Sequence, residues 1–301
     1  MGTVLLAGAS HRAVPRIWPR SWPRLRIYDL LLGVPMLAWQ LAFFAAPLGF
    51  LVALSFWSVR NYRLSPDFRW TNWETVLGQP HFWQAYAVTS GMAAGAALLV
   101  SAIAFPCAYA IAFRCKPSIA RLATLLLVVP FFSSYLVRVY SWQVFLSDNG
   151  IINAALGLAG VAPLPLLNSM FGTFVGYATL SLPLVVMLQL FGLTQVDRTL
   201  IEAARNLGCS PLRGVVQVIV PAARPAIVMA ALFCFILTFG DFVSPLYLGG
   251  GKQVVLSTLI TDTTKAGQQW PRAAVVALMM IGTLLATALA ATWYAYRAER
   301  P

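Results

Sequence analysis

The chain has 301 residues, of which 59% are hydrophobic and only 10% are charged. Because a soluble domain carries roughly 25% charged residues, this composition excludes an ordinary soluble protein, and the long unbroken apolar runs exclude a β-barrel, whose strands alternate over about ten residues. The formal charge of +12 does not indicate a nucleic-acid partner, because the basic residues cluster beside apolar segments and form no single stripe.

Residues 1–29 are predicted to form a basic cytoplasmic tail. Five arginines and two tryptophans lie in this tail: Arg12, Arg16, Arg20, Arg24, Arg26, Trp18 and Trp22. Such a composition is typical of a segment that binds the anionic lipid surface of a membrane. The next apolar run is too long for the h-region of a cleavable signal, so we expect no cleavage. A second cytoplasmic tail, residues 297–301, follows the last apolar run.

Residues 30–296, between the two tails, are predicted to form one all-α membrane domain. A window of about 19 residues finds six apolar segments that are long enough to cross a hydrocarbon core of about 30 Å as helices. They are residues 35–57, 85–113, 122–146, 170–193, 226–248 and 273–296. The sequence therefore predicts six transmembrane helices.

The Lys and Arg residues predict how these spans are oriented. With the amino terminus inside, fourteen of them fall in cytoplasmic segments and six in outer segments, while Arg138 lies within a span. Short cytoplasmic loops are enriched in Lys and Arg, so both termini are predicted to be cytoplasmic. The loop of residues 196–224, between the fourth and fifth spans, is then cytoplasmic as well.

Helix breakers and small-residue pairs within the spans predict local features of the bundle. Two G-x-x-x-G pairs, Gly91 with Gly95 and Gly172 with Gly176, predict close helix packing. Four prolines lie inside the apolar runs: Pro47, Pro106, Pro130 and Pro183. Each leaves a backbone carbonyl without its helical partner, and a neighbouring helix must supply a hydrogen bond to that carbonyl. The four cysteines contain no C-x-x-C pair, and none lies in a predicted outer loop, so we expect free thiols.

Residues 199–221 form a polar and basic segment in an otherwise apolar chain. Thr199 and Glu202 have the spacing of a capping box, which predicts the start of a helix. Gly208 can adopt the positive φ that ends a helix. A first short helix is therefore predicted between Thr199 and Gly208.

A second short helix is predicted directly after this glycine. Ser210 and Pro211 suit its N-cap and N1 positions, and Pro221 and Pro225 are predicted to end it. From the residues alone two interpretations stay open. The helices form either an interfacial hairpin on lipid or a docking site for a cytoplasmic partner.

A longer pattern in the same segment resembles the EAA loop of ABC importer permeases, E-A-A-x3-G-x9-I-x-L-P. Residues 202–204 (EAA), Gly208 and residues 218–221 (VIVP) match it, with mild apolar changes at Val218 and Val220. The position before the penultimate span also matches. In that family the loop is the coupling helix, which sits in a cleft of the ATPase subunit.

The resemblance implies the type I ABC importer permease fold, a dimer of permeases and a cytoplasmic ABC ATPase dimer. It implies that the ATPase-coupling residues are Glu202, Ala203, Ala204, Arg205, Gly208, Ser210 and Pro211. ATP and Mg²⁺ would bind to the ATPase, and this chain would bind no cofactor. Residues 249–253 (GGGKQ) lack the first glycine and the final hydroxyl residue of a phosphate-binding loop.

Three further stretches resemble spermidine/putrescine-type permeases within that class, and the likeness extends over about residues 30–296. They are residues 135–142 (YLVRVYSW), 146–153 (LSDNGIIN), and 240–245 with 248–251 (GDFVSP and LGGG). The resemblance implies import of polyamines or a similar small cation across a bacterial inner membrane, with delivery by a periplasmic substrate-binding protein and a second, homologous permease subunit. An opine, an aminophosphonate or ferric ion remains an alternative solute.

Asp241 is the predicted acidic contact for a cationic solute. It lies in the predicted fifth span, where a carboxylate at a helix centre costs about 2.5–3.5 kcal/mol unless it is paired or hydrated. The alternative is an internal ion pair with Arg138, and both can hold if the solute competes for the pair.

The other residues predicted to line the substrate pathway are mostly aromatic, because aromatic faces attract ammonium groups by roughly 0.5–2 kcal/mol. They are Tyr135, Tyr140, Trp142, Phe239, Phe242 and Tyr247, with Asp148 in the following outer loop. The alternative for each ring is an interfacial aromatic belt, and the alternative for Asp148 is a turn.

Other classes of function have less support in the residues. No nucleophile–base pair is apparent, and His11 and His81 have no second ligand at a useful spacing. We therefore expect neither catalytic residues nor a metal site. A passive channel and a membrane-embedded enzyme remain alternatives, which binding of an ATPase to residues 199–221 would exclude.

Overall fold

The computed structural model describes residues 27–60, 62–265 and 267–297, with side chains from residue 34 onward. The arginines and tryptophans predicted for the basic tail, His11 and residues 298–301 lie outside the described residues. The chain divides into two compact units, Met1–Phe50 and Leu51–Pro301, which are described separately.

The first unit is helical in its described part. Helix α1 (Ile27–Gln40) continues through a π-helical turn, η1 (Leu41–Ala45), into α2 (Ala46–Ser55), which extends into the second unit. In this turn the amide of Ala46 bonds to the carbonyl of Leu41, five residues back. Residues Val34–Ser55 are long and apolar enough to cross a membrane.

The second unit begins with short elements. Strands β1 (Ser58–Arg60) and β2 (Arg63–Ser65) pair as an antiparallel hairpin, and helix α3 (Thr71–Leu77) follows. Asp67 forms ion pairs with Arg60 at 3.3 Å and with Arg69 at 2.9 Å. This carboxylate therefore holds two of the basic residues that were predicted in the first outer loop.

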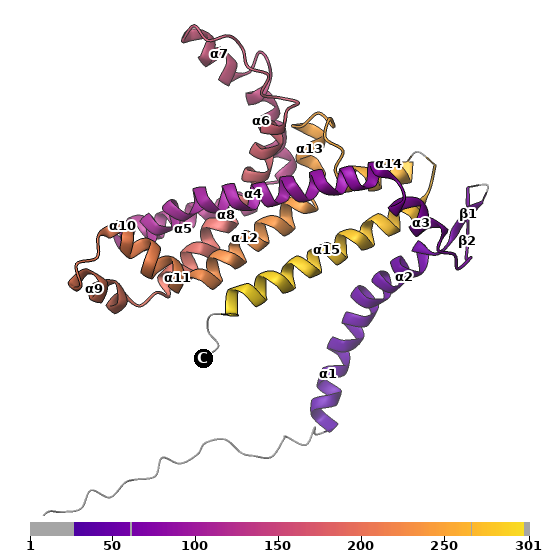
Figure 1. Ribbon diagram of the computed structural model, residues 1–301, viewed down its shortest axis with the longest axis horizontal. Helices are drawn as coiled ribbons and strands as arrows, with labels where there is room; N and C mark the ends of the chain where they lie inside the picture. The colour runs from indigo at the N-terminus through magenta and orange to yellow at the C-terminus, as the bar shows by residue number, and fades with distance from the viewer. Residues whose placement is uncertain (1–26, 61, 266, 298–301) are drawn as a thin grey trace, which may run out of the picture. The chain divides into compact units, whose positions relative to one another are not determined.

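The core of this unit is a bundle of long helices. Helices α4 (Pro80–Phe113), α8 (Met170–Thr194) and α12 (Arg224–Phe239) pack pairwise against one another, and α15 (Trp270–Tyr296) packs on α12 and on α14 (Leu256–Lys265) (Figure 1). Small side chains bring α4 close to its neighbours: Ala93, Ala96, Ala104 and Ala108 are buried. Fully buried Gln189 of α8 donates to the hydroxyl of Ser101 of α4 at 2.7 Å, a polar bond between helices of the kind found in membrane bundles.

Four of the six predicted spans are continuous helices, and the third is broken. Helix α5 (Pro117–Val128) and a 3₁₀ turn, η2 (Val129–Phe132), are followed by α6 (Tyr135–Leu146) and α7 (Ile151–Leu158) after a bend of 96°. The predicted third span, residues 122–146, is therefore made of two helical segments rather than one continuous helix. Pro130, which cannot continue the regular hydrogen bonding of a helix, lies in the turn that precedes the bend.

The fifth predicted span, residues 226–248, is also interrupted. Helix α12 ends at Phe239, and α13 (Val243–Tyr247) follows after a break at residues 240–242. At its other end, α12 bends by 74° from the preceding helical segment, residues 211–222. By length and composition, four helices in the described residues could each cross a membrane, and the number of spans is six if each of the two bent helix pairs counts as one span.

The two glycine pairs differ in what they pack against. A Cβ atom on Gly172 would lie 2.7 Å from the carbonyl oxygen of Leu248, and one on Gly176 would collide with Ser244. A Cβ atom on Gly91 would meet no atom within 4 Å. The prediction of close packing is confirmed for the pair on α8, which lets α13 approach that helix, and not for Gly91.

We predict that Gly172→Ala destabilises the chain by about 1–3 kcal/mol, because the new methyl group meets rigid backbone. Gly91→Ala is the matched control in a neighbouring helix, and we expect it to be neutral or stabilising by up to about 1 kcal/mol. The midpoint of thermal unfolding of the purified chain in detergent measures both. A Gly172→Ala variant as stable as the control would contradict the close approach of α13.

Candidate functional site

The segment predicted as the coupling loop begins with a helix capped by an aspartate. Helix α9 (Arg198–Asn206) has Asp197 as its N-cap, whose carboxylate accepts a hydrogen bond from the amide of Thr199 at 2.9 Å. This bond lowers the pKa of Asp197 below its usual value. The predicted capping box is therefore wrong, because Thr199 lies inside the first turn and Glu202 is two residues beyond the N3 position, which Leu200 occupies.

The corner after α9 has the predicted geometry. Gly208 has a φ of +78°, and Ser210 and Pro211 are the N-cap and first residue of the next helix. That helix consists of α10 (Pro211–Gly214), a π-helical turn η3 (Val215–Ile219) and α11 (Val220–Ala222). Pro221 lies within it and does not end it; the helix ends at Ala222, with Ala223 as its C-cap, between the two prolines that were predicted to end it.

The loop has one face on the bundle and one face open. Ile201, Val215 and Ile219 pack against the buried cluster formed by α4, α8 and α12. On the open face, Leu207 and Leu212 are 88% and 80% exposed. Ala204 is half-buried. The other predicted coupling residues are exposed: Glu202, Ala203, Arg205, Gly208, Ser210 and Pro211. Large apolar side chains exposed among polar ones are typical of a surface that binds another protein.

Arg224 connects the end of this loop to the last helix. Its guanidinium donates to the carbonyl of Tyr294 in α15 at 2.7 Å and lies 4.0 Å from the centroid of the Tyr294 ring. The loop is therefore held at its exit by a hydrogen bond and a cation–π contact.

Asp241 lies at the other end of the bundle, in the break between α12 and α13. Its carboxylate is 8% exposed and accepts hydrogen bonds from the amides of Val243 at 2.9 Å and Ser244 at 3.2 Å, from the Ser244 hydroxyl at 2.5 Å and from the Tyr135 hydroxyl at 2.7 Å. Tyr135 also bonds to the hydroxyl of Ser244. The carboxylate thus caps α13 and joins it to α6, and it does not lie inside a helix as predicted.

The alternative of an ion pair between Asp241 and Arg138 is contradicted. Arg138 donates instead to the carbonyl of Thr179 in α8 at 2.9 Å. The residue four positions after Thr179 is Pro183, which has no amide hydrogen to offer this carbonyl. Arg138 therefore satisfies a backbone group that the proline leaves free, which gives this basic residue a structural role within a span.

The remaining pathway residues fall into three groups. Tyr140 of α6 and Tyr247 of α13 have ring centroids 5.3 Å apart in an edge-on contact, and Tyr140 and Phe242 are each 48% exposed. Trp142 packs against the cluster between α6 and α13. Phe239 is fully buried and its ring stacks on that of Phe235, so no part of this ring is exposed on the single chain.

Asp148 is exposed in the turn between α6 and α7 and has no contact with Asp241. Among the described residues, no group of three His, Cys, Asp or Glu side chains could hold a metal ion. Ser244 was not predicted from the sequence, while the prediction that a neighbouring helix bonds the carbonyl freed by Pro183 is confirmed by Arg138 of α6. The D-x-x-S spacing of Asp241 and Ser244, which suits a helix cap, is the signal that was available.

Comparison with known proteins places the chain in a family. Residues 103–297 match the family described as binding-protein-dependent transport system inner membrane component. The chain belongs to this family. It is a multi-pass protein of the inner membrane and a translocation subunit rather than an enzyme, and the ATPase of such a transporter is a separate subunit.

Two relatives are named spermidine/putrescine transport system permease protein PotB. The present chain is 29% identical to the Haemophilus influenzae protein over 75% of its own length and 78% of that protein's. It is 27% identical to the Escherichia coli protein over 68% of this chain and 75% of that one.

A solved structure has the same fold. It is a bacterial alginate ABC transporter in complex with alginate pentasaccharide-bound periplasmic protein, which superimposes with a TM-score of 0.69 over 91% of this chain and 95% of that chain, at 16% identity. At this identity the likeness shows the fold alone. The predicted type I importer permease fold is confirmed.

We predict that Arg138→Ala destabilises the permease by about 1.5–3 kcal/mol, since a hydrogen bond from a charged group is lost in the bundle. In a Pro183→Ala background the loss becomes smaller, because the new amide can bond to the Thr179 carbonyl. A double-mutant cycle on thermal unfolding measures this coupling. Pro106→Ala, in α4, is the control background. The Thr179 assignment fails if Arg138→Ala costs the same in all three backgrounds.

The cap of α9 predicts a pH dependence. The folded-state pKa of Asp197 is lowered from 3.8, so its stabilisation is fully present above about pH 4 and is lost as the pH falls through the folded-state value. We expect amide exchange at Thr199, relative to the unfolded chain, to accelerate only at acidic pH. Asp197→Asn keeps an acceptor and removes this dependence. Hydrogen-exchange mass spectrometry from pH 7 to 3 compares the two chains, and identical profiles would contradict the cap.

Proposed function

We propose that the permease is the membrane subunit of an ATP-driven importer that moves polyamines, such as spermidine and putrescine, or a similar small cation from periplasm to cytoplasm. Two independent lines support this proposal. The first is the similarity to two permeases of spermidine/putrescine transport systems over most of the chain. The second is the chemistry at the break between α12 and α13.

The observation that carries the proposal is a buried carboxylate beside aromatic rings that are open to solvent. Asp241 contributes negative charge next to Phe242, and Tyr140 and Tyr247 form an aromatic pair on the adjoining helices. Aromatic faces attract ammonium groups. Because four donors already bond to Asp241, we infer that its charge attracts the solute while the exposed faces of Tyr140 and Phe242 make the contact.

The coupling loop supports an ATP-driven mechanism. Its open face, with Leu207, Leu212 and the exposed coupling residues, suits a cleft of an ATPase. We infer that an ATPase dimer docks on this face and that ATP and Mg²⁺ bind to the ATPase itself. We also infer that this loop and both termini are cytoplasmic, in line with the distribution of Lys and Arg. A second, homologous permease would complete the pathway.

The movement follows from this arrangement. A periplasmic binding protein delivers solute to the outer loops. Closure of the ATPases on ATP displaces the coupling loops, and the two bundles rock between outward- and inward-facing states, as alternating access requires. The permease itself makes and breaks no covalent bond.

Uptake measurements test the proposal. A strain that lacks the gene, complemented with the wild-type permease, is expected to take up labelled spermidine or putrescine above the deletion background. Tyr140→Ala is expected to lower the initial rate by about 2- to 30-fold, corresponding to one cation–π contact of about 0.5–2 kcal/mol.

Tyr140→Phe is the matched control, because it keeps the ring and is expected to keep the rate. If neither polyamine enters while a labelled aminophosphonate, an opine or ferric iron does, the solute is wrong and the transport class stands. If none of these enters and no ATPase co-purifies with the permease, the importer itself is wrong.

A further inference from the structure

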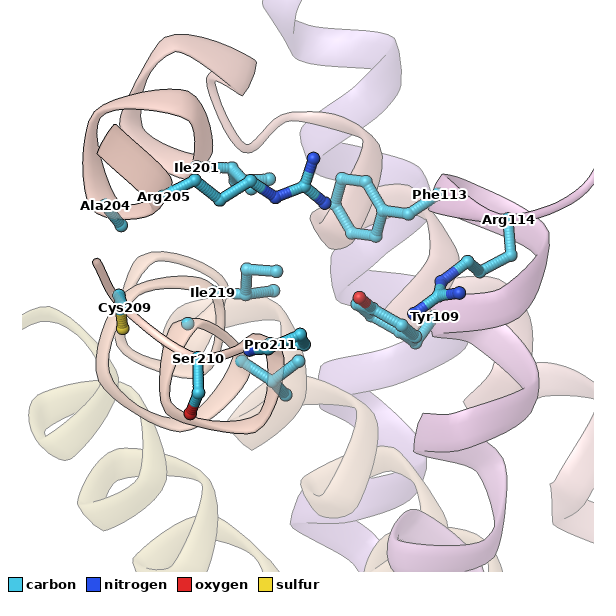
Figure 2. A pocket seen from close by; sticks show the side chains of 12 residues that line it. Tyr109, Phe113, Arg114, Ile201, Ala204, Arg205, Cys209, Ser210, Pro211 and Ile219 are labelled. Carbon is cyan, nitrogen blue, oxygen red and sulfur yellow. The ribbon is translucent and has the colours of Figure 1, made fainter. Parts of the chain in front are cut away.

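A cavity lies between the coupling loop and the adjacent end of α4. Its volume is about 370 Å³, and Tyr109 and Phe113 of α4 and Arg114, its C-cap, face Arg205 of α9 across it. A smaller cavity of about 180 Å³ shares Tyr109, Phe113 and Arg205 and adds Arg198. Figure 2 shows the side chain of Arg205 extending toward Phe113, and that of Arg114 lying next to Tyr109. Each cavity is therefore lined by two arginines, Arg114 and Arg205 in the larger one and Arg198 and Arg205 in the smaller one, and Arg205 belongs to both.

These positive charges have no carboxylate partner. Within the parts of the chain that the structure describes, the ion pairs are those of Asp67 with Arg60 and Arg69, in a different part of the second unit. Glu202 lines the smaller cavity but pairs with none of the three arginines. The electrostatic field in the cavity therefore favours an anion.

The shape and lining of the cavity select the kind of anion. The planar fork of an arginine matches the oxygens of a phosphate group and bonds to them in a bidentate manner. The hydroxyl of Tyr109 is a further donor at the wall, and Ser210, whose hydroxyl makes no capping bond, is another. Phe113 and Ile219 supply apolar wall beside these polar groups.

We propose that this cavity is a binding site for a phosphate-bearing anion, which bridges α4 and α9 through Arg114 and Arg205. A polyamine is repelled by the same charges, so the site is distinct from the solute pathway. The bound anion holds the coupling loop against the bundle and thereby affects how far the loop can move. The inference does not depend on which solute is imported.

The phosphate group can come from an anionic lipid or from a soluble phosphate. Lys116 lies in the turn between α4 and α5 and Arg121 follows within α5, and basic clusters beside spans attract anionic headgroups. The two sources share one chemistry, and a direct binding experiment can distinguish them.

Cys209 provides a reporter inside the site, because it lines the larger cavity and is partly exposed. The full chain with Cys107→Ser and Cys115→Ser keeps Cys209 as the reactive thiol, while Cys234 is buried. The rate of maleimide alkylation is measured in detergent at constant ionic strength, with inorganic phosphate, with short-chain phosphatidylglycerol and with short-chain phosphatidylcholine.

We expect a phosphate-bearing anion to slow the alkylation of Cys209, and zwitterionic phosphatidylcholine to have little effect. Arg114→Gln is expected to raise the concentration for half-protection about fivefold, and Arg114→Gln with Arg205→Gln about 25-fold, as for loss of one and two phosphate contacts. Arg213→Gln is the matched control, since Arg213 is exposed in the same loop and lines neither cavity.

Each outcome decides the proposal. Protection by both ligands indicates a soluble phosphate, and protection by phosphatidylglycerol alone indicates a lipid headgroup. The proposal is overturned if neither ligand protects Cys209, or if protection persists unchanged in the double variant. Unreactive Cys234 verifies that each variant is folded. None of these readouts involves solute uptake, so failure of this site and failure of the polyamine assignment are distinguishable.

Discussion

Backbone amide and carbonyl groups within a hydrocarbon layer must be bonded inside the protein, since lipid offers no partner. The interrupted helices of this permease follow from that constraint. The carboxylate of Asp241 bonds to the amides that begin α13, and Arg138 bonds to the carbonyl that Pro183 leaves free in α8. Asp241 therefore stabilises the break between α12 and α13, and Arg138 compensates a missing hydrogen bond within the continuous helix α8. The break permits the chain to place aromatic rings at an irregular site.

Helix α8 is the element that the two functional regions have in common. Near its beginning, Gly172 and Gly176 allow α13 to pack closely. Near its end, Leu193 lies in the cluster that supports Ile219 of the coupling loop. Between these ends, the bond from Gln189 to Ser101 joins α8 to α4. Helix α8 is therefore packed along its length, which is a physical requirement for force from the proposed coupling loop to reach the proposed solute pathway.

The coupling loop shows how far a local pattern predicts local structure. The positive φ of Gly208 and the restart at Ser210 and Pro211 were predictable, because these conformations depend on a few neighbouring residues. The cap of α9 was not, because two residues, Asp197 and Thr199, can serve as N-cap, and the structure uses Asp197. Pro221 did not end its helix because the π-helical turn before it changes the hydrogen-bonding register.

The sequence by itself determined that this is a helical membrane protein with one polar loop between its spans, because hydrophobic burial acts along each apolar run. The class of importer permease came from the resemblance of that loop to the EAA pattern of a known family. Only the tertiary structure decided the partners of Asp241 and Arg138 and the burial of Phe239. Residues 135 and 241 lie far apart in the chain, and their contact depends on the packing of α6 against α13, which no local pattern records.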